Sequence, residues 1–424
     1  MDLLTDLAFR GQLYQQTDAE GLKRHLAEPR KVYAGFDPTK DSLGVGNLVQ
    51  ILLLRRFQQA GHTPVVVMGG GTGMIGDPSG KEAERTIMSP EQVAHNVAGQ
   101  RKIYERLLRF DGPNAAVLVN NADWLTKLGF IEALRDIGKH FSVNMMIQKD
   151  SVRERLNNRD QGISYTEFSY MLLQAYDFSY LLEHHDVTVQ AAGSDQWGNI
   201  VAGVDLIRRT RQREAFGMTT PLITKADGTK FGKTETGNIW LSPERTSPYA
   251  FFQFWVNAND ADIPKYLRTF TFFSHDEIAA LEAEHAKDPG ARAAHRALAK
   301  HMTELLHGVS GLQQAQKATE ALFSGNVGEL SEASIADLFG SAPSARLLRE
   351  KLAGPGYLVV DLLVDAGVVK SKREAREFLG NGAILINGRQ PGAETHVSSD
   401  WLLHGGVLLI RRGKKLWHVA RFDP

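Results

Sequence analysis

The sequence contains no cysteine among its 424 residues. Disulfide bonds and catalysis by a thiolate are therefore excluded, and a structural zinc site is not expected, because such sites usually include cysteine ligands. The absence of cysteine does not indicate in which redox compartment the protein works. A chain of this length is expected to form two or three domains with a large hydrophobic core.

The sequence also lacks an excess of charge and a long apolar segment. It has 49 basic and 49 acidic residues, so no global field attracts nucleic acid, although a local basic patch is compatible with this balance. No run of about 18 apolar residues is present, and the N-terminus lacks the basic and apolar regions of a signal peptide. These absences predict a globular, cytoplasmic protein without a membrane partner.

Short apolar runs separated by turn residues indicate an α/β fold in the first half of the chain. Lys31–Phe36 and residues 65–68 are two such runs, and Leu48–Ala60 carries apolar residues at helical spacing between them. This pattern predicts a β-α-β unit, and a further strand is expected at residues 187–190. We therefore predict a doubly wound, Rossmann-like parallel sheet, in which ligands collect at the carboxyl ends of the strands.

The remainder of the chain divides into regions of different pattern. Residues 89–150 are mostly helical in pattern, and helical spacing returns beyond Pro248, with His285–His307 as its longest amphipathic part. Gly356 is expected to be a hinge before a small C-terminal module. The predicted regions are a catalytic domain with a helical insertion (1–224), a mobile loop region (225–247), an all-helical domain (248–322), a linker (323–355) and a small α+β domain (356–424).

Two lysines three positions apart lie in a polar, loop-like segment. Lys230-Phe-Gly-Lys-Thr234 follows Lys225-Ala-Asp-Gly-Thr229, which offers almost nothing to bury. Ammonium groups on flexible stems can follow the charge that moves onto a leaving pyrophosphate, and glycine lets the backbone come close. The same pattern is also typical of a solvated loop that binds no ligand.

Polar residues on one helical segment have a spacing suited to a small ligand. Tyr170, Gln174 and Asp177 lie at positions i, i+4 and i+7, so one face of a helix would carry all three. Such a face fits a small zwitterion, but it is equally typical of hydrogen bonds satisfied in a core. Tyr33 is in the first strand, and with Asp177 it would suit a phenolic ligand, unless it is an ordinary buried strand tyrosine.

The segment that follows the predicted strand at 187–190 carries a third set of polar groups. In Gly193-Ser-Asp195-Gln196, the aspartate is suited to accept from ribose hydroxyls and the glutamine to contact an α-phosphate or a carboxylate. The alternative is that Asp195 only caps the helix that follows.

Together these segments resemble the bacterial tyrosyl-tRNA synthetases, which are class I aminoacyl-tRNA synthetases, over essentially the whole chain. The segments that carry the resemblance are Asp37-Pro-Thr39, Gly73–Ser79, Asp136–Asn144, Thr166–Tyr170, Gly193–Asn199 and Lys225–Thr234. The resemblance implies a tyrosine-tRNA ligase that activates L-tyrosine with ATP and Mg²⁺ and transfers it to the 3′ end of tRNA(Tyr). It also implies a homodimer whose shared surface includes Phe141–Met146.

The resemblance assigns roles to individual residues. It implies tyrosine binding by Tyr33, Asp77, Asn121, Tyr170, Gln174, Asp177 and Gln190. It implies ATP binding by Asp37, Thr39, Gly44, Gly46, Asn47, Gly193, Asp195, Gln196 and Lys233. It implies catalytic contacts by Thr39, Asn47, Lys81, Arg85, Lys230, Lys233 and Thr234. No protein nucleophile, tightly bound metal or organic cofactor is implied, because the tyrosine carboxylate itself attacks the α-phosphorus.

The chain departs from the family at one turn. Where the family carries His-x-Gly-His, this sequence has Gly44-Val45-Gly46-Asn47. Gly44 has no side-chain donor, whereas Asn47 keeps an amide donor and Gly46 still permits approach of the nucleotide. One transition-state donor is worth about 3 kcal/mol, so losing two is expected to slow adenylation by about four orders of magnitude, with a smaller effect on substrate binding.

The C-terminal module resembles the S-four-like RNA-binding domains, with a basic helix at Ser371–Arg376 and a strand in Gly382–Gly388. The basic residues expected to contact RNA phosphates are Lys372, Arg373, Arg376, Arg411, Arg412, Lys414 and Lys415. A solvated charged face is the alternative.

Two other functions remain consistent with the sequence. A chain without the histidine pair would also suit a catalytically weak RNA-binding scaffold, which accumulation of aminoacylated tRNA would exclude. A tryptophan-specific synthetase is the other, but it would not need the pair formed by Tyr33 and Asp177, and a preference for tyrosine would exclude it.

Overall fold

The computed structural model describes residues 2–77, 88–149, 152, 153, 156, 162–229, 231–234, 237–325, 327–340, 342–413 and 416–423. The chain forms two compact units, one from Met1–Thr246 and Gln253–Leu306 and the other from Ser247–Phe252 and His307–Pro424. Helices α11 (Pro248–Val256) and α14 (Ala293–Ser324) contribute residues to both units. No helix among the described residues is long and apolar enough to cross a membrane.

Within the described residues, the first unit is built on a six-stranded sheet with the order β1-β6-β5-β2-β3-β4. The strands are β1 (Gln15–Gln16), β2 (Lys31–Phe36), β3 (Thr63–Met68), β4 (Val117–Asn120), β5 (Val187–Gly193) and β6 (Phe216–Thr220). All neighbours are parallel except β1, which runs antiparallel to β6 at the edge. Apart from this edge strand, the parallel arrangement confirms the predicted α/β class.

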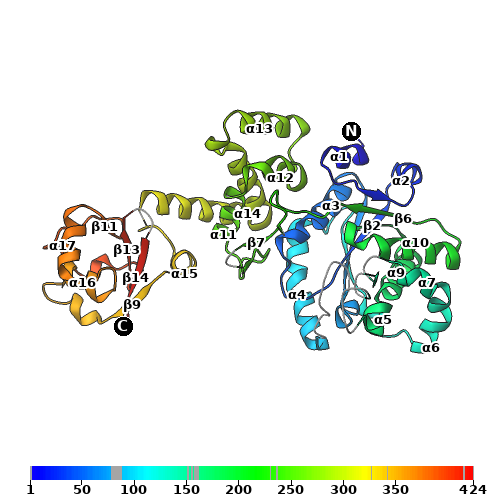
Figure 1. Ribbon diagram of the computed structural model, residues 1–424, viewed down its shortest axis with the longest axis horizontal. Helices are drawn as coiled ribbons and strands as arrows, with labels where there is room; N and C mark the ends of the chain where they lie inside the picture. The colour runs from blue at the N-terminus through cyan, green and yellow to red at the C-terminus, as the bar shows by residue number, and fades with distance from the viewer. Residues whose placement is uncertain are drawn as a thin grey trace. The chain divides into compact units, whose positions relative to one another are not determined.

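Helices cover both faces of this sheet. The main ones are α3 (Leu48–Gln59), α4 (Pro90–Leu107), α9 (Tyr165–His185) and α10 (Trp197–Arg211). Figure 1 shows α4 on one side of the sheet and α9 and α10 on the other. From β2 the chain continues to β3 and β4 on one side of β2, and it then forms β5 and β6 on the opposite side of β2. The topological switch point of the sheet therefore lies between β2 and β5.

The expected strand at Lys31–Phe36 and helix at Leu48–Ala60 are confirmed as β2 and α3. The mostly helical interpretation of residues 89–150 missed β4, because Val117–Asn120 is only four residues long and periodicity cannot separate so short an apolar run from a helix. Its place is fixed by parallel pairing with β3.

The rest of the first unit is helical. Its elements are α1 (Leu3–Phe9), α2 (Ala19–His25), α5 (Ala122–Leu125), α6 (Phe130–Glu132), α7 (Val143–Ile147), α12 (Ile263–Phe270) and α13 (His275–Lys287), with a hairpin of β7 (Lys233–Thr234) and β8 (Gly237–Asn238). The amphipathic segment His285–His307 is divided between the end of α13 and the start of α14. Pro289 and Gly290 interrupt it, and Arg292 adopts a left-handed conformation (φ 51°) before α14 begins.

The second unit contains a four-stranded sheet with the order β11-β13-β14-β9 among its described residues. Its elements are α15 (Glu332–Phe339), β9 (Ser344–Leu347), β10 (Tyr357–Leu358), α16 (Val359–Asp365), α17 (Lys372–Gly380), β11 (Ile384–Ile386), β12 (His396–Val397), β13 (Val407–Arg412) and β14 (Leu416–Phe422). Figure 1 shows α16 and α17 on one side of the sheet and α15 on the other.

Residues 323–355, expected to be a linker, take part in this fold. They contain α15 and β9, and β9 pairs in parallel with β14, Ser344 opposite Val419. Ile335 of α15 is buried in the same apolar cluster as Val419. The described residues between 323 and 355 therefore belong to the folded second unit and do not form a linker.

Candidate active site

The carboxyl ends of β2, β3 and β4 bring polar side chains together beside the switch point. Thr72, in the turn after β3, donates its hydroxyl to Oδ1 of Asp37 at 2.9 Å, and Asn121, after β4, accepts the backbone N–H of Gly71 at 2.7 Å. A Cβ atom on Gly69 would lie 2.4 Å from Oδ1 of Asp37. Glycine is therefore required there for the strand ends to approach each other.

A buried carboxylate from α9 completes this cluster. Asp177 accepts hydrogen bonds from Nε1 of Trp124 at 2.7 Å and from Nδ2 of Asn121 at 2.9 Å. Burial raises the pKa of Asp177 to about 7, and the negative charge of Asp37 adds to the rise, while the two hydrogen bonds oppose it. The carboxylate is thus held in place as an acceptor.

Two polar groups next to Asp177 have no partner. Tyr33 of β2 and Gln190 of β5 are neighbours in the parallel ladder, and both are 2% exposed. The hydroxyl of Tyr33 and Oε1 of Gln190 make no hydrogen bond with any described residue. Burial, with the charge of Asp177, raises the pKa of Tyr33 well above its ordinary value, so the phenol stays protonated. A bound polar group would satisfy both atoms.

Further polar groups connect α9 to the segment after β5. The hydroxyl of Tyr170 donates to Oδ2 of Asp37 at 3.2 Å. Asn199 donates to both Gln174 (3.0 Å) and Gln196 (3.1 Å), and Gln196 in turn donates to Oδ2 of Asp77 at 2.7 Å. The i, i+4, i+7 face predicted on α9 is therefore directed at this network.

The turn formed by Gly44–Asn47 leads into α3. Its backbone pairs with the segment after the hairpin, where the N–H of Val45 donates to Ile239 at 2.9 Å. The amide of Asn47 donates to the carbonyl of Gly44 at 3.3 Å. A Cβ at Gly44 would meet only the carbonyl of Ile239, at 3.8 Å, and one at Gly46 would meet nothing within 4 Å. A Cβ atom would therefore fit at either glycine.

The β7–β8 hairpin lies against this turn. Phe231 is 5% exposed and stacks on Phe270, with ring centroids 5.3 Å apart. At Gly232 (φ 83°) a Cβ would lie 2.6 Å from Cγ1 of Val45, so a larger residue would push the hairpin off the turn. Lys233 follows directly and is exposed.

Comparison with known proteins identifies the family. Residues 25–324 match the family described as tRNA synthetases class I (W and Y), and residues 334–420 match the Tyrosine–tRNA ligase SYY-like C-terminal domain. Tyrosine–tRNA ligase 1 of Bacillus anthracis is 50% identical over 426 residues, which cover 100% of both chains. The chain belongs to the tyrosyl-tRNA synthetase family.

Other relatives of this synthetase agree. The Tyrosine–tRNA ligase of Bacillus caldotenax is 51% identical over 430 residues, covering 100% of each chain. A C-terminally truncated mitochondrial tyrosyl-tRNA synthetase of Aspergillus nidulans superposes with a TM-score of 0.68 at 28% identity, over 76% of this chain and 94% of that one. A tryptophanyl-tRNA synthetase from Encephalitozoon cuniculi (TM-score 0.55, 14% identity, 74% of this chain and 87% of that one) shares the fold.

The synthetase brings most of its predicted site residues to the sheet ends. Those joined there by contacts or strand pairing are Tyr33, Asp37, Thr39, Asp77, Asn121, Tyr170, Gln174, Asp177, Gln190 and Gln196. Gly193 ends β5, and a Cβ there would lie 2.6 Å from Oδ1 of Asp195, which is exposed. Lys81, Arg85 and Lys230 lie outside the described residues.

Three contacting residues were missed. Thr72 lies in the glycine-rich turn after β3, where a ligand was expected to approach the backbone, but its own side chain was given no role. Nothing in the spacing of Trp124 marks it. Asn199 ends the family-like segment that starts at Gly193, so its position carried a usable signal.

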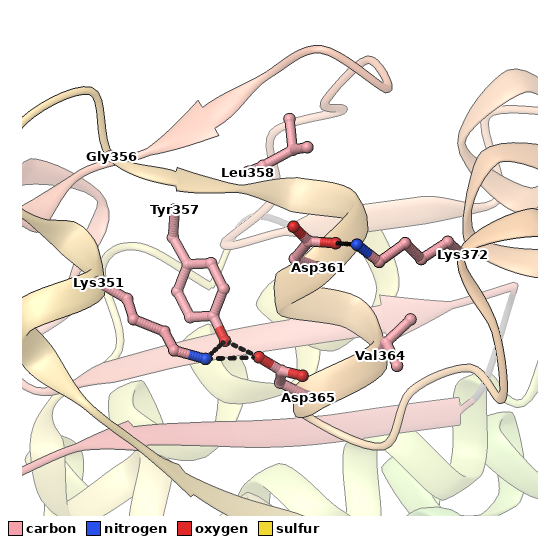
Figure 2. Close-up of a pocket in the computed structure, with 8 residues that line it drawn as sticks. All are labelled: Lys351, Gly356, Tyr357, Leu358, Asp361, Val364, Asp365 and Lys372. Atoms are coloured by element: carbon pink, nitrogen blue, oxygen red, sulfur yellow. Dashed lines mark hydrogen bonds and ion pairs between the residues drawn. The ribbon is translucent and has the colours of Figure 1, made fainter.

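The basic residues of the second unit that are expected to contact RNA differ in the contacts that their side chains make. Arg373 and Arg376 are exposed on α17, whereas Nζ of Lys372 pairs with Asp361 at 2.7 Å, as Figure 2 shows. Arg412 donates to the carbonyl of Val368 at 2.8 Å.

Arg411 packs its guanidinium over the ring of Trp417, and Lys414 and Lys415 lie outside the described residues. A cavity of about 500 Å³ lies beside Lys372, where Tyr357 and Lys351 both contact Asp365 (Figure 2). Of the described residues expected to contact RNA, Arg373 and Arg376 are thus exposed without the ion pair that engages Lys372 or the contacts that engage Arg411 and Arg412.

Proposed function

We propose that the chain activates L-tyrosine with ATP and transfers the tyrosyl group to the 3′ end of tRNA(Tyr). The observation that carries this proposal is the buried hydroxyl of Tyr33, which has no hydrogen-bond partner among the described residues and lies beside the acceptor Asp177. The phenol of tyrosine both donates and accepts, so it would satisfy Asp177 and Tyr33 together.

The same cluster would discriminate against related amino acids. Phenylalanine has no hydroxyl, and the indole of tryptophan only donates, so either would leave buried polar groups unpaired. At the opposite end, the carboxylate of Asp77 with Tyr170 and Gln174 would bind the substrate ammonium. Asn121 would act by fixing the orientation of Asp177.

ATP, with Mg²⁺ as its counterion, would lie across the ends of β2 and β5. Asp37, Thr39, Gly193, Asp195 and Gln196 would surround the nucleoside, while Lys81, Arg85, Lys230, Lys233 and Thr234 would approach the phosphates. A carboxylate oxygen of tyrosine forms a bond to the α-phosphorus, and the bond from that phosphorus to the bridging oxygen breaks, so that pyrophosphate leaves with the electron pair. The protein positions the reactants and stabilises the developing charge.

In the second step, a hydroxyl of the terminal adenosine of tRNA attacks the tyrosyl carbonyl, and AMP leaves. We propose that the first step is slow in this chain. Gly44 offers no side-chain donor, and the amide of Asn47 points back to the carbonyl of Gly44. Both features remove hydrogen bonds that would strengthen in the transition state.

The partners we propose are tRNA(Tyr) and a second copy of the chain, in the cytoplasm. Arg373 and Arg376 would neutralise tRNA phosphates. A homodimer is supported by a group of large apolar side chains exposed on neighbouring short helices, which we call the apolar patch: Phe130, Ile131, Leu134, Val143, Met145 and Ile147.

Tyrosine-dependent ATP–pyrophosphate exchange, followed by aminoacylation of tRNA(Tyr), tests the proposal. We expect exchange and esterified tRNA with tyrosine, and neither with phenylalanine or tryptophan. A preference for tryptophan would contradict the assignment of the Tyr33 and Asp177 cluster. Binding of tRNA without any esterified product would favour the catalytically weak RNA-binding scaffold.

A further inference from the structure

Three aromatic rings lie in contact next to the buried carboxylate of Asp177. The rings of Trp124 and Tyr180 are stacked, with their centroids 4.5 Å apart and an angle of 15° between the two planes. The imidazole of His184 lies against Tyr180 in turn, with a centroid distance of 4.2 Å. Trp124 belongs to α5, whereas Tyr180 and His184 belong to α9. The proposed reaction has so far given Tyr180 and His184 no role.

Helix α9 contacts the indole of Trp124 at two points. Asp177 accepts the hydrogen bond of the indole nitrogen at 2.7 Å, and Tyr180, on the next turn of the same helix, covers a face of the indole. Trp124 is 5% exposed, Tyr180 is half-buried and His184 is exposed. The three rings therefore lead from the surface of α9 to the carboxylate of the candidate site.

The orientation of the indole depends on contacts outside its own helix. α5 has only four residues, which is too short for a helix that is stable by itself. The torsion between Cβ and an aromatic ring has broad minima, so the backbone alone does not direct the indole N–H at Asp177. Leu181 and Leu182 share the apolar cluster of Trp124, but aliphatic side chains offer no flat surface that selects one plane of the ring. Tyr180 offers such a surface.

We propose that Tyr180 is a positioning residue for tyrosine recognition, because its ring holds the indole of Trp124 in the plane that directs the N–H at Asp177. The carboxylate is thereby kept in the orientation in which its other electron pairs accept from the substrate phenol. Tyr180 itself touches no substrate and acts only through Trp124 and Asp177. The inference rests on the proposed function, in which the phenol of tyrosine is the group that Asp177 receives.

Two substitutions at position 180 separate the ring from the rest of the side chain. Tyr180→Leu keeps an apolar side chain but removes the flat face, whereas Tyr180→Phe keeps the ring and loses only the hydroxyl. Because Tyr180 is half-buried, both variants are expected to fold. Tyr176→Leu is the matched control, since Tyr176 is also a half-buried tyrosine of α9 but forms no ring pair with Trp124 among the described residues.

The indole N–H of Trp124 reports the orientation of the ring without any substrate. In the full chain with ¹⁵N-labelled tryptophan, the resonance of Trp124 is assigned among those of the six tryptophans by its absence from Trp124→Phe. A hydrogen bond to a carboxylate moves this proton resonance downfield. We expect Tyr180→Leu to shift it upfield, and Tyr180→Phe and Tyr176→Leu to leave it at the position of the parent.

Tyrosine-dependent ATP–pyrophosphate exchange gives the second readout. In Tyr180→Leu the KM for tyrosine is expected to rise about three- to tenfold, the factor by which a stacked aromatic pair shifts an equilibrium. The kcat of exchange and the KM for ATP should stay unchanged, because the phenol contact is the same in the ground state and the transition state. A general loss of stability would instead lower kcat, since it reduces the fraction of active enzyme.

The inference is overturned if Tyr180→Leu leaves either the Trp124 resonance or the KM for tyrosine as in the parent. It is also overturned if Tyr180→Phe or Tyr176→Leu changes them as much as Tyr180→Leu does. A parent chain that binds no tyrosine would refute the proposed function itself, and the resonance would still show whether Tyr180 orients Trp124. The two failures are therefore distinguishable.

Discussion

Trp124 and Asp177 are joined by a 2.7 Å hydrogen bond from the indole nitrogen to the carboxylate, between two helices on the same side of the sheet. The bond supplies one of two donors to a carboxylate that is almost fully buried. Trp124 therefore acts through Asp177 as a positioning residue for the proposed tyrosine site.

Removing this donor is expected to weaken tyrosine binding. In Trp124→Phe the ring is retained but the N–H is lost, so the pKa of Asp177 should rise further and the acceptor becomes less available. We expect the affinity for tyrosine to fall about tenfold near neutral pH, measured by equilibrium dialysis. Trp401→Phe in the second unit is the control and should bind as the parent does; equal affinity in both variants would contradict the role of Trp124.

Tyrosine binding is also expected to depend on pH. Burial raises the pKa of Asp177 to about 7, so the carboxyl takes up a proton as the pH falls through that value and no longer accepts from a phenol. The affinity should fall about tenfold between about pH 8 and about pH 6, in a binding titration without ATP. A flat profile over this range would show that Asp177 does not receive the substrate hydroxyl.

The same pKa has the opposite consequence for stability. Between pH 3.8 and about 7 the unfolded chain has released the proton of Asp177 while the folded protein keeps it, so this group's contribution to stability declines as the pH rises. Asp177→Asn is therefore expected to stabilise the protein more at about pH 8 than at about pH 5, by about 1–3 kcal/mol in urea unfolding. An equal effect at both values would contradict a raised pKa.

Introducing a side-chain donor at position 44 is expected to accelerate adenylation. A Cβ at Gly44 has 3.8 Å to its nearest neighbour, so Gly44→His should fold as the parent does. We expect exchange about 10²–10³ times faster at unchanged tyrosine affinity, and more in Gly44→His/Asn47→His. Gly44→Ala, which adds a Cβ at the same position but no donor, serves as the control. Equal exchange rates in the parent and the histidine variants would mean that this turn does not limit the step.

The basic face of α17 is expected to act in tRNA binding alone. Arg373→Glu/Arg376→Glu should weaken tRNA binding at least about tenfold and reduce its salt dependence, while tyrosine-dependent exchange is unchanged. Arg296→Glu/Lys300→Glu, at two exposed positions on α14, is the charge-matched control. If it weakens tRNA binding equally, the effect is one of net charge and not of α17.

The apolar patch is expected to hold the proposed dimer. Ile131 is 73% exposed, and Ile131→Asp should convert a dimer to monomers in sedimentation experiments, because it places charge in a dry interface. Val309→Asp, at an exposed apolar residue on α14, should leave the mass unchanged. A monomeric parent chain would refute the dimer outright.

Much of the catalytic fold was predictable because its signals are local. The strand at Lys31–Phe36 is an apolar run ended by Asp37-Pro38, and the face of Tyr170, Gln174 and Asp177 follows from helical spacing alone. β4 was not, since its identity depends on pairing with β3, a contact between segments about fifty residues apart.

Site residues could be predicted where a polar side chain stands out in an otherwise apolar strand or helix. Residues whose role is to orient another side chain could not be predicted. Asp177 and Tyr33 attract attention as polar groups in apolar elements. Trp124 looks like an ordinary core aromatic, because only the folded chain brings its N–H to a carboxylate from a distant helix.

The empty space around Gly44 and Gly46 has a consequence for how this turn can vary. A Cβ atom fits at either position, so alanine substitutions there are expected to leave cooperative unfolding as it is. A selection that reports only on folded protein would accept alanine at either position. Only an assay of turnover would reveal what such a chain had gained or lost.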